Sequence, residues 1–163
     1  MLQSLGYRPR EVRYAYELDL CHGLILPGGE STTIYIQAQR MNLLEPLLRF
    51  AKRAPLFGTC AGAILMAKLG ILDVNVERNA YGRQIASFCE PISFQKHCFS
   101  ALFIRAPIIR ELGSTVEVLA THQGMPVCVQ QGHHLAATFH PELTEDGTIH
   151  RYWLEQIKQN QEA

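Results

Sequence analysis

The chain has 163 residues, 47% of them hydrophobic, and its 15 basic and 15 acidic side chains give a formal net charge of zero. This length predicts one domain over residues 1–163 with a sizeable core, and the neutral balance of charge argues against a nucleic-acid partner. No apolar run approaches the ~18 residues that cross a membrane, and five cysteines without close pairing favour a reducing, cytoplasmic location over a disulfide framework.

The first half of the chain alternates short apolar runs with amphipathic segments. Residues 1–6 have the character of a helix's last turn, and residues 11–14 suggest a short strand. The apolar run 23–26 predicts a buried strand that ends at the turn residues 27–29. The acidic and hydroxyl side chains of residues 30–33 then predict the capped start of a helix.

Two further helices flank a second buried strand. Asn42 opens a segment with leucines at helical spacing, residues 54–59 form an apolar run, and residues 61–68 favour a helix. Beyond them we expect strands and a closing helix, at 72–77, 85–94, 101–105, 116–121, 126–130, 135–139 and 148–159. This order predicts an α/β fold, a three-layer sandwich with a mainly parallel central sheet and antiparallel additions.

One cysteine lies at the corner between the second strand and the helix that follows it. Cys60 stands between Gly58 and Gly62, and both glycines permit a sharp turn. Such a turn would expose the thiol above the sheet, where the amides of the helix N-terminus favour its thiolate. The alternative is a buried, structural cysteine in a glycine-lined bend.

A nucleophilic cysteine needs a base, and His140-Pro141-Glu142 offers one. In an extended chain, residues two apart point the same way, so His140 and Glu142 can share a face at a strand end. Cysteine, imidazole and carboxylate would then act as nucleophile, proton acceptor and orienting group. Taken singly, His140 could equally be a structural histidine and Glu142 a solvated carboxylate.

Acyl transfer also needs donors for an oxyanion. The backbone N–H of Ala61, directly after the nucleophile, and that of Gly29 in the double-glycine turn are the candidates. A double glycine after a strand is more often a plain turn, so this prediction depends on Cys60.

The remaining cysteines and histidines carry no further motif. The cysteines lie in apolar surroundings and are expected to be buried or half-buried: Cys21, Cys89, Cys98 and Cys128. His133-His134 has no second ligand cluster at metal spacing, so no metal site is expected. No chemical context distinguishes the other histidines, His22, His97, His122 and His150.

Five segments occur in one order that resembles a known family. They are Gly23–Thr33, Phe57–Gly62, Val76–Gln84, Phe103–Pro107 and Thr138–Thr144. Together they resemble the glutaminase subunits of pyridoxal 5′-phosphate synthase, which are class I (triad) glutamine amidotransferases. The segment Phe57–Gly62 and the His-Pro-Glu would fit many class I members, whereas the other three segments are more particular to these subunits. The resemblance covers nearly the whole chain and implies a flavodoxin-like core.

The resemblance also implies an activity. Cys60 would attack the side-chain amide of L-glutamine, forming a glutamyl thioester and releasing ammonia. His140 would protonate the ammonia and then activate water, and Glu142 would orient His140. No cofactor is implied. The ammonia would pass, within a hetero-oligomer and away from any membrane, to a (β/α)₈ synthase subunit that builds pyridoxal phosphate.

Six positions match the family's glutamine-contacting residues. They are Gly29, Glu30, Ser31, Arg78, Ile104 and Arg105. The chemistry agrees, because an α-carboxylate calls for arginine and an α-amine for a carboxylate or carbonyl. The alternative for the two arginines is that they are surface charges.

The sequence departs from the family in two places. The family begins with a strand and an apolar-Gln-Gly turn that this sequence lacks. The connection at residues 68–71 of this sequence is also shorter than the family's. A sheet without the first strand would expose a strand edge and apolar surface. Two other readings therefore stay open: a catalytically impaired binding or regulatory homologue, or the glutaminase subunit of another class I amidotransferase.

Overall fold

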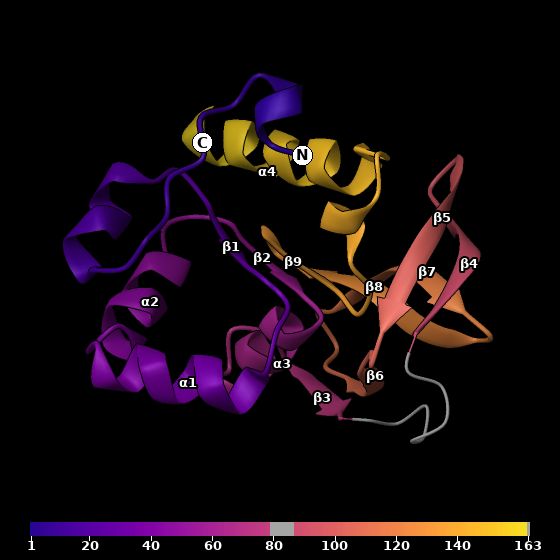
Figure 1. Ribbon diagram of the computed structural model, residues 1–163, viewed down its shortest axis with the longest axis horizontal. Coiled ribbons are helices and arrows are strands. Elements are labelled where there is room, and N and C mark those ends of the chain that lie inside the picture. The colour runs from indigo at the N-terminus through magenta and orange to yellow at the C-terminus, as the bar shows by residue number, and fades with distance from the viewer. Residues whose placement is uncertain (79–86, 163) are drawn as a thin grey trace.

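The computed structural model describes residues 1–78 and 87–162, and a five-stranded sheet lies at its centre (Figure 1). Three strands run parallel in the order β1 (Leu24–Leu26), β2 (Leu56–Thr59), β9 (His134–Ala137). Two antiparallel strands, β8 (Met125–Gln131) and β7 (Glu117–His122), extend the sheet beyond β9. The predicted sandwich, parallel at its centre with antiparallel additions, is confirmed.

Helices cover both faces of this sheet. On one face lie α2 (Leu44–Ala51) and α3 (Ala61–Lys68), and α1 (Ser31–Arg40) packs beside α3. On the other face lies α4 (Thr148–Glu162), with the N-terminal turn next to it (Figure 1). Helix α2 begins two residues later than predicted, because Asn42 takes a left-handed conformation at φ 54°.

Alternating side chains of the strands divide the core into two clusters. On β2, Leu56 points to the α2–α3 side and Phe57 to the α4 side, and both are fully buried. Neighbouring strand β9 repeats the pattern, with Ala136 on the first side and Leu135 on the second. The sheet is therefore buried on both faces, which explains why its central strands are continuous apolar runs.

Two antiparallel pairs complete the fold. A hairpin joins β4 (Ser87–Phe94) to β5 (His97–Ile104), and β3 (Val74–Glu77) pairs with β6 (Ile108–Leu112). The sequence did not predict β6 or the first half of β5. Of the strand predicted at 85–94, residues 85 and 86 lie outside the described residues.

The strand predicted at residues 11–14 is wrong. The carboxylate of Glu17 accepts the backbone N–H groups of Arg13 at 2.6 Å and of Tyr14 at 2.9 Å. Glu17 thus uses these N–H groups to cap the start of a 3₁₀ helix, Ala15–Leu20, and they are not available for a sheet. The turn predicted at the N-terminus is present as a 3₁₀ helix, Gln3–Leu5, which Gly6 ends at φ 84°.

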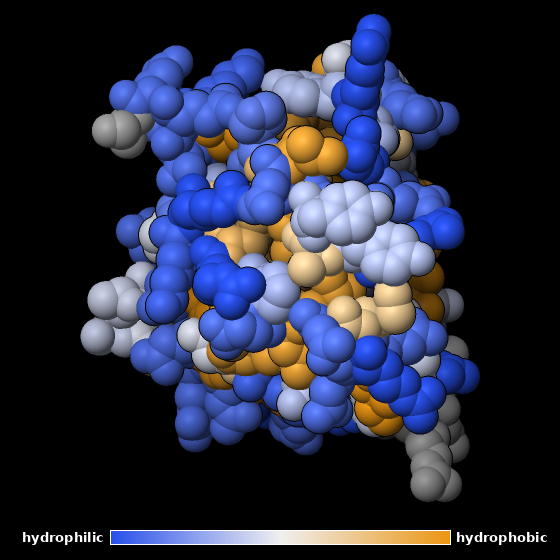
Figure 2. Space-filling model, turned by 90° about the vertical axis from the view of Figure 1, so that its left-hand side faces the viewer, coloured by the Kyte–Doolittle hydropathy of each residue, from blue (hydrophilic) through white to orange (hydrophobic). Residues whose placement is uncertain are grey.

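The outer edge of β1 has no strand partner in the described part of the chain. A groove of about 1060 Å³ runs between this edge and residues 8–14, and its lining includes Leu24, Leu26 and Leu47. Figure 2 shows the apolar surface that this groove exposes. The expected open strand edge and apolar surface are both confirmed.

The surroundings of the cysteines differ partly from expectation. Cys128 is buried and Cys21 half-buried as expected, but Cys89 and Cys98 are exposed. The last two lie on outward-facing positions of the β4–β5 hairpin, where apolar sequence neighbours alternate to the opposite face. Among residues 1–78 and 87–162, no helix is both long enough and apolar enough to cross a membrane.

Candidate active site

Cys60 lies at the sharp turn between β2 and α3. Its backbone adopts φ 49° and ψ −105°, a conformation that non-glycine residues rarely take. The Cys60 N–H donates to the Ala137 carbonyl at 2.8 Å, which ties the turn to β9. A Cβ on Gly62 would lie 1.9 Å from the Leu26 carbonyl oxygen, so only glycine lets α3 start this close to β1. The predicted strand–turn–helix geometry is therefore confirmed.

The prediction that the Cys60 side chain is exposed is wrong. Only 6% of the residue is accessible, and its Sγ lies 3.7 Å from the Ile104 carbonyl oxygen. The end of β5 folds over the turn, and the Leu102 carbonyl there accepts the His140 N–H at 2.8 Å. The same strand end thus holds both the cysteine and the histidine.

His140 and Glu142 form a short hydrogen bond, 2.7 Å between Nδ1 and Oε1. They do so from a 3₁₀ turn, Pro141–Leu143, which follows His140 directly. The expected reason for their proximity, an extended chain with residues two apart on one face, is therefore wrong. Thr59, at the end of β2, adds a long contact of 3.5 Å from its hydroxyl to the same Glu142 oxygen.

His140 and Glu142 each stabilise the charged form of the other. The hydrogen bond with Cys60, followed by that with Glu142, raises the pKa of His140 to about 9, although burial opposes the shift. Burial raises the pKa of Glu142, but the hydrogen bond and charge of His140 outweigh it, so this pKa lies below its ordinary value. At neutral pH an imidazolium therefore lies between the sulfur and a carboxylate.

The absence of a side chain at Gly28 leaves the space that the His140 ring occupies. A Cβ on Gly28 would lie 2.3 Å from Cε1 of the His140 ring, so a side chain there would displace the imidazole. The sequence pointed to this double-glycine turn as a source of oxyanion donors but missed this packing role. Its other member, Gly29, has a φ of 139°, which favours glycine.

Glu30 and Arg78, both predicted to contact glutamine, bind each other. Arg78 Nη2 lies 2.8 Å from Glu30 Oε1, and Nη1 donates to the Thr32 hydroxyl at 3.0 Å. Glu30 also caps α1 by accepting the backbone N–H groups of Thr32 and Thr33, which lower its pKa to about 2. Ser31 is the buried first residue of α1. Both charged side chains are about half exposed.

The remaining predicted contacts lie next to the thiol. Ile104 ends β5, and Arg105 follows it in an exposed, left-handed position at φ 44°. Ala61 is the first residue of α3, so its N–H has no partner within the helix. Residues 79–84 of the segment Val76–Gln84 lie outside the described residues.

Two neighbouring histidines outside the site have structural partners. His134 Nδ1 accepts the Leu56 N–H at 3.2 Å, and His133 Nε2 lies 3.3 Å from the Ala51 carbonyl oxygen. Within the described ranges, no three histidine, cysteine or acidic side chains are grouped so that they could hold a metal ion.

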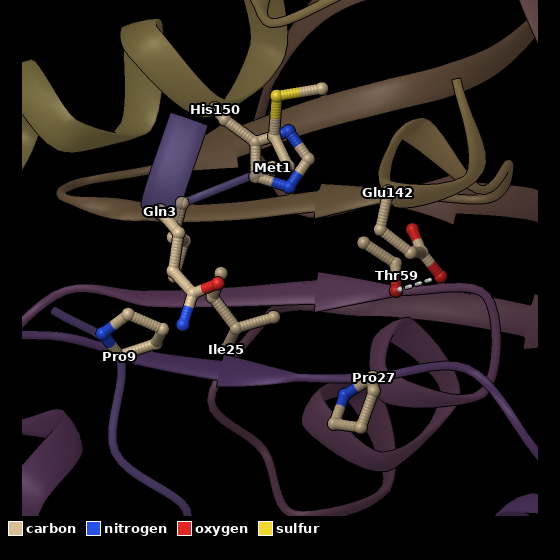
Figure 3. Close-up of a pocket in the computed structure, with 9 residues that line it drawn as sticks. Met1, Gln3, Pro9, Ile25, Pro27, Thr59, Glu142 and His150 are labelled. Carbon is tan, nitrogen blue, oxygen red and sulfur yellow. Dashed lines mark hydrogen bonds between the residues drawn. The ribbon is translucent and has the colours of Figure 1, made fainter. Parts of the chain in front are cut away.

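One histidine near the site was missed. His150 lies in the first turn of α4 and lines a cavity of about 290 Å³ together with Thr59 and Glu142 (Figure 3). The available signal was a histidine at helical spacing with the buried residues Trp153 and Leu154. Helical spacing alone does not distinguish a structural from a functional histidine.

Comparison with known proteins supplies the family. A model of the SNO glutamine amidotransferase family matches residues 1–159. A pyridoxal 5′-phosphate synthase subunit PdxT from Thermotoga neapolitana is 50% identical over 170 residues, covering 96% of this chain and 90% of its own length. The subunit of the same name from Brevibacillus brevis is 45% identical over 171 residues, covering 98% of this chain and 90% of its own length.

Solved structures agree in fold. The crystal structure of a glutamine amidotransferase superimposes with a TM-score of 0.92 at 45% identity, covering 96% of this chain and 90% of that one. A second glutamine amidotransferase, from Thermotoga maritima, shares the fold alone, with a TM-score of 0.57 at 17% identity over 98% of this chain and 70% of that one. With a family match over nearly its whole length and relatives of this identity, the chain belongs to the SNO glutamine amidotransferase family.

Proposed function

We propose that this chain is the glutaminase subunit of a pyridoxal 5′-phosphate synthase, an enzyme that hydrolyses L-glutamine to L-glutamate and ammonia. The observation that carries the proposal is the 2.7 Å bond between His140 Nδ1 and Glu142 Oε1, at an imidazole whose pKa Cys60 also raises. A nucleophile, a base and an orienting carboxylate in this order are what acyl transfer from an amide requires.

In the first half-reaction Cys60 Sγ attacks the carbon of the glutamine carboxamide. The thiol proton is held by His140, whose raised pKa of about 9 keeps the imidazole protonated at neutral pH. The negative charge that develops on the carboxamide oxygen is stabilised by the N–H groups of Ala61 and Gly29. His140 then donates its proton to the nitrogen, the C–N bond breaks, and ammonia leaves a glutamyl thioester on Cys60.

In the second half-reaction water replaces ammonia. His140, now neutral, removes a proton from the water as it attacks the thioester carbon, and the C–S bond breaks to release glutamate. Glu142 fixes the tautomer of His140 throughout, because its carboxylate accepts the Nδ1–H. No step needs a redox change or a cofactor.

Charged side chains at the positions that match the family's glutamine contacts would supply specificity for glutamine. Arg78 and Arg105 are cations suited to the α-carboxylate, and Glu30 is an anion suited to the α-ammonium group. Glu30 and Arg78 already hold each other at 2.8 Å, so the pair presents both charges in a fixed arrangement. The Ile104 carbonyl and Ser31 complete the proposed contacts.

The names of the relatives indicate the kind of protein that this chain would bind. The PdxT proteins are subunits of pyridoxal 5′-phosphate synthase. We propose that this chain likewise binds a (β/α)₈ synthase subunit in a hetero-oligomer and passes ammonia to it. Five free cysteines support a reducing, cytoplasmic compartment.

The test is glutamate release from glutamine by the purified chain mixed with its synthase subunit. The wild type and a Cys89→Ser control, which alters an exposed thiol on β4, should both release glutamate. Cys60→Ala should reduce release to the background rate. Absence of glutamate from the wild-type complex, or its persistence in Cys60→Ala, would overturn the proposal.

A further inference from the structure

His150 is a buried polar side chain that the reaction above does not use. Only 2% of the residue is accessible, and its Nδ1 has no hydrogen-bond partner among the described residues. The ring of Phe57 packs edge-on against it, with the ring centroids 5.6 Å apart. Because buried polar atoms are nearly always paired, this nitrogen calls for an explanation.

Glu142 has a matching unpaired atom. Its Oε1 is bound by His140 and lies near Thr59, but its buried Oε2 has no partner in the described part of the chain. A carboxylate oxygen can only accept hydrogen bonds, so Oε2 needs a donor. Without one, the carboxylate can turn and weaken its bond to His140.

The two side chains face the same cavity of about 290 Å³ (Figure 3). Burial is the largest influence on His150 and lowers its pKa to about 4, while the charge of Glu142 acts in the opposite direction. The amino group of Met1 is the other charge that reaches His150, and it lowers this pKa further. His150 is therefore neutral at pH 7, and a neutral imidazole carries one N–H donor.

We infer that His150 is a positioning residue, which donates its ring N–H to Glu142 Oε2 through one water in the shared cavity. With both oxygens held, Glu142 keeps Oε1 on His140 Nδ1. The cavity is large enough for a bridging water and has polar groups on two sides. The catalytic importance of this contact rests on the proposed function, but the hydrogen bond itself does not.

The first test reads the pKa of His140 in the isolated chain by NMR titration of its imidazole. His150→Phe keeps an aromatic ring but removes the donor, so the pKa of His140 should fall by roughly one pH unit as Glu142 loosens. His150→Gln, which restores an N–H, should recover most of the shift. Trp153→Phe removes another buried, unpartnered N–H one turn along α4 and should leave His140 unchanged.

A second experiment keeps His150 and changes Glu142, with the NMR signal of His150 as the measurement. Glu142→Gln should shift the ring N–H resonance of His150, because the acceptor loses its charge. An unchanged His140 pKa in His150→Phe, or an unchanged His150 resonance in Glu142→Gln, would overturn the inference. Should His150→Phe fail to fold, the Glu142→Gln spectrum still decides the matter.

Kinetics of the complex with the synthase subunit then test the role in the reaction. His150→Phe should lower kcat for glutamine hydrolysis about tenfold with KM nearly constant, as is common for residues that orient a functional group. In a Glu142→Gln background it should have no further effect. Multiplied effects would overturn the role. A wild-type complex without activity would instead count against the proposed function, while the NMR result would stand.

Discussion

Cys60 occupies a backbone conformation that its own side chain makes unfavourable. At φ 49° and ψ −105° a Cβ crowds the neighbouring peptides, which costs about 1–3 kcal/mol. The bond from Cys60 N–H to the Ala137 carbonyl and the close contact of α3 with β1 keep the residue there. The strained turn therefore lowers the stability of the fold while holding the sulfur at the end of β2, next to the site of His140.

This strain predicts an unusual order of stability among variants at position 60. Cys60→Gly should be more stable than Cys60→Ala by about 1 kcal/mol, because glycine adopts this conformation without the steric conflict. Urea denaturation of both variants measures the difference. An alanine variant equal to or more stable than the glycine variant would show that the turn is not strained.

A second prediction concerns the glycine beneath the imidazole. Gly28→Ala would place a methyl group 2.3 Å from the present position of His140 Cε1, so the ring must leave its present position. We expect glutaminase activity to fall about 100-fold, as is usual when reacting groups are displaced by an ångström. Gly147→Ala, where the nearest atoms belong to the flexible Arg151 side chain, serves as the control. Wild-type activity in Gly28→Ala would contradict this packing.

At the level of elements, the contact between α3 and β1 fixes the position of the turn. Gly62→Ala would bring a methyl group to 1.9 Å from the Leu26 carbonyl oxygen, a backbone atom that cannot turn aside. Overpacking of this kind should destabilise the protein by about 3 kcal/mol. Thermal unfolding should show the loss, whereas Gly6→Ala, strained at φ 84° but free of neighbours, should cost about 1 kcal/mol. Equal losses would argue against a clash.

The elements that sequence predicted well are those whose pattern is set by burial on both faces. Strands β1, β2 and β9 are short apolar runs between turn signals, and they were placed to within about two residues. Strand β6 was missed because its last three residues are exposed and its pairing with β3 is a long-range choice. The segment at 11–14 was misassigned because capping by Glu17, a local interaction, takes its donors.

The candidate site could be predicted as far as sequence motifs reach. Cys60, His140 and Glu142 were proposed as a group, and the structure brings these side chains together; their catalytic roles stay a prediction. The burial of Cys60 could not be foreseen, because it depends on where β5 ends. Gly28 and His150 were missed because their roles arise from contacts across the fold, which no local pattern records.

At the scale of the whole molecule, the protonation of buried histidines links stability to pH. Burial lowers the pKa of His134 and of His150 to about 4, while Cys60 and Glu142 raise that of His140 to about 9. Between pH 6.5 and 4, His134 and His150 bind protons in the unfolded chain but not in the folded chain, so the free energy of unfolding decreases as the pH falls. Between 6.5 and 9 the folded chain holds a proton that the unfolded chain releases, so stability falls as the pH rises.

The histidines therefore predict a stability maximum near pH 6.5. His150→Phe should reduce the loss of unfolding free energy between pH 6.5 and 4 by on the order of 2 kcal/mol. His140→Phe should likewise reduce the loss between pH 6.5 and 9. Urea midpoints measured from pH 4 to 9 give both slopes. An acid slope that His150→Phe leaves unchanged would mean that this residue is not buried in its neutral form.

In the proposed mechanism Cys60 carries the glutamyl group between the two half-reactions. The most direct measurement of this role is an acid quench of the complex during turnover of radiolabelled glutamine, followed by peptide mapping of the covalently bound label. We expect label on the peptide that contains Cys60, sensitive to hydroxylamine as a thioester is, and none in Cys60→Ser. Label on another peptide, or label that survives in Cys60→Ser, would contradict it.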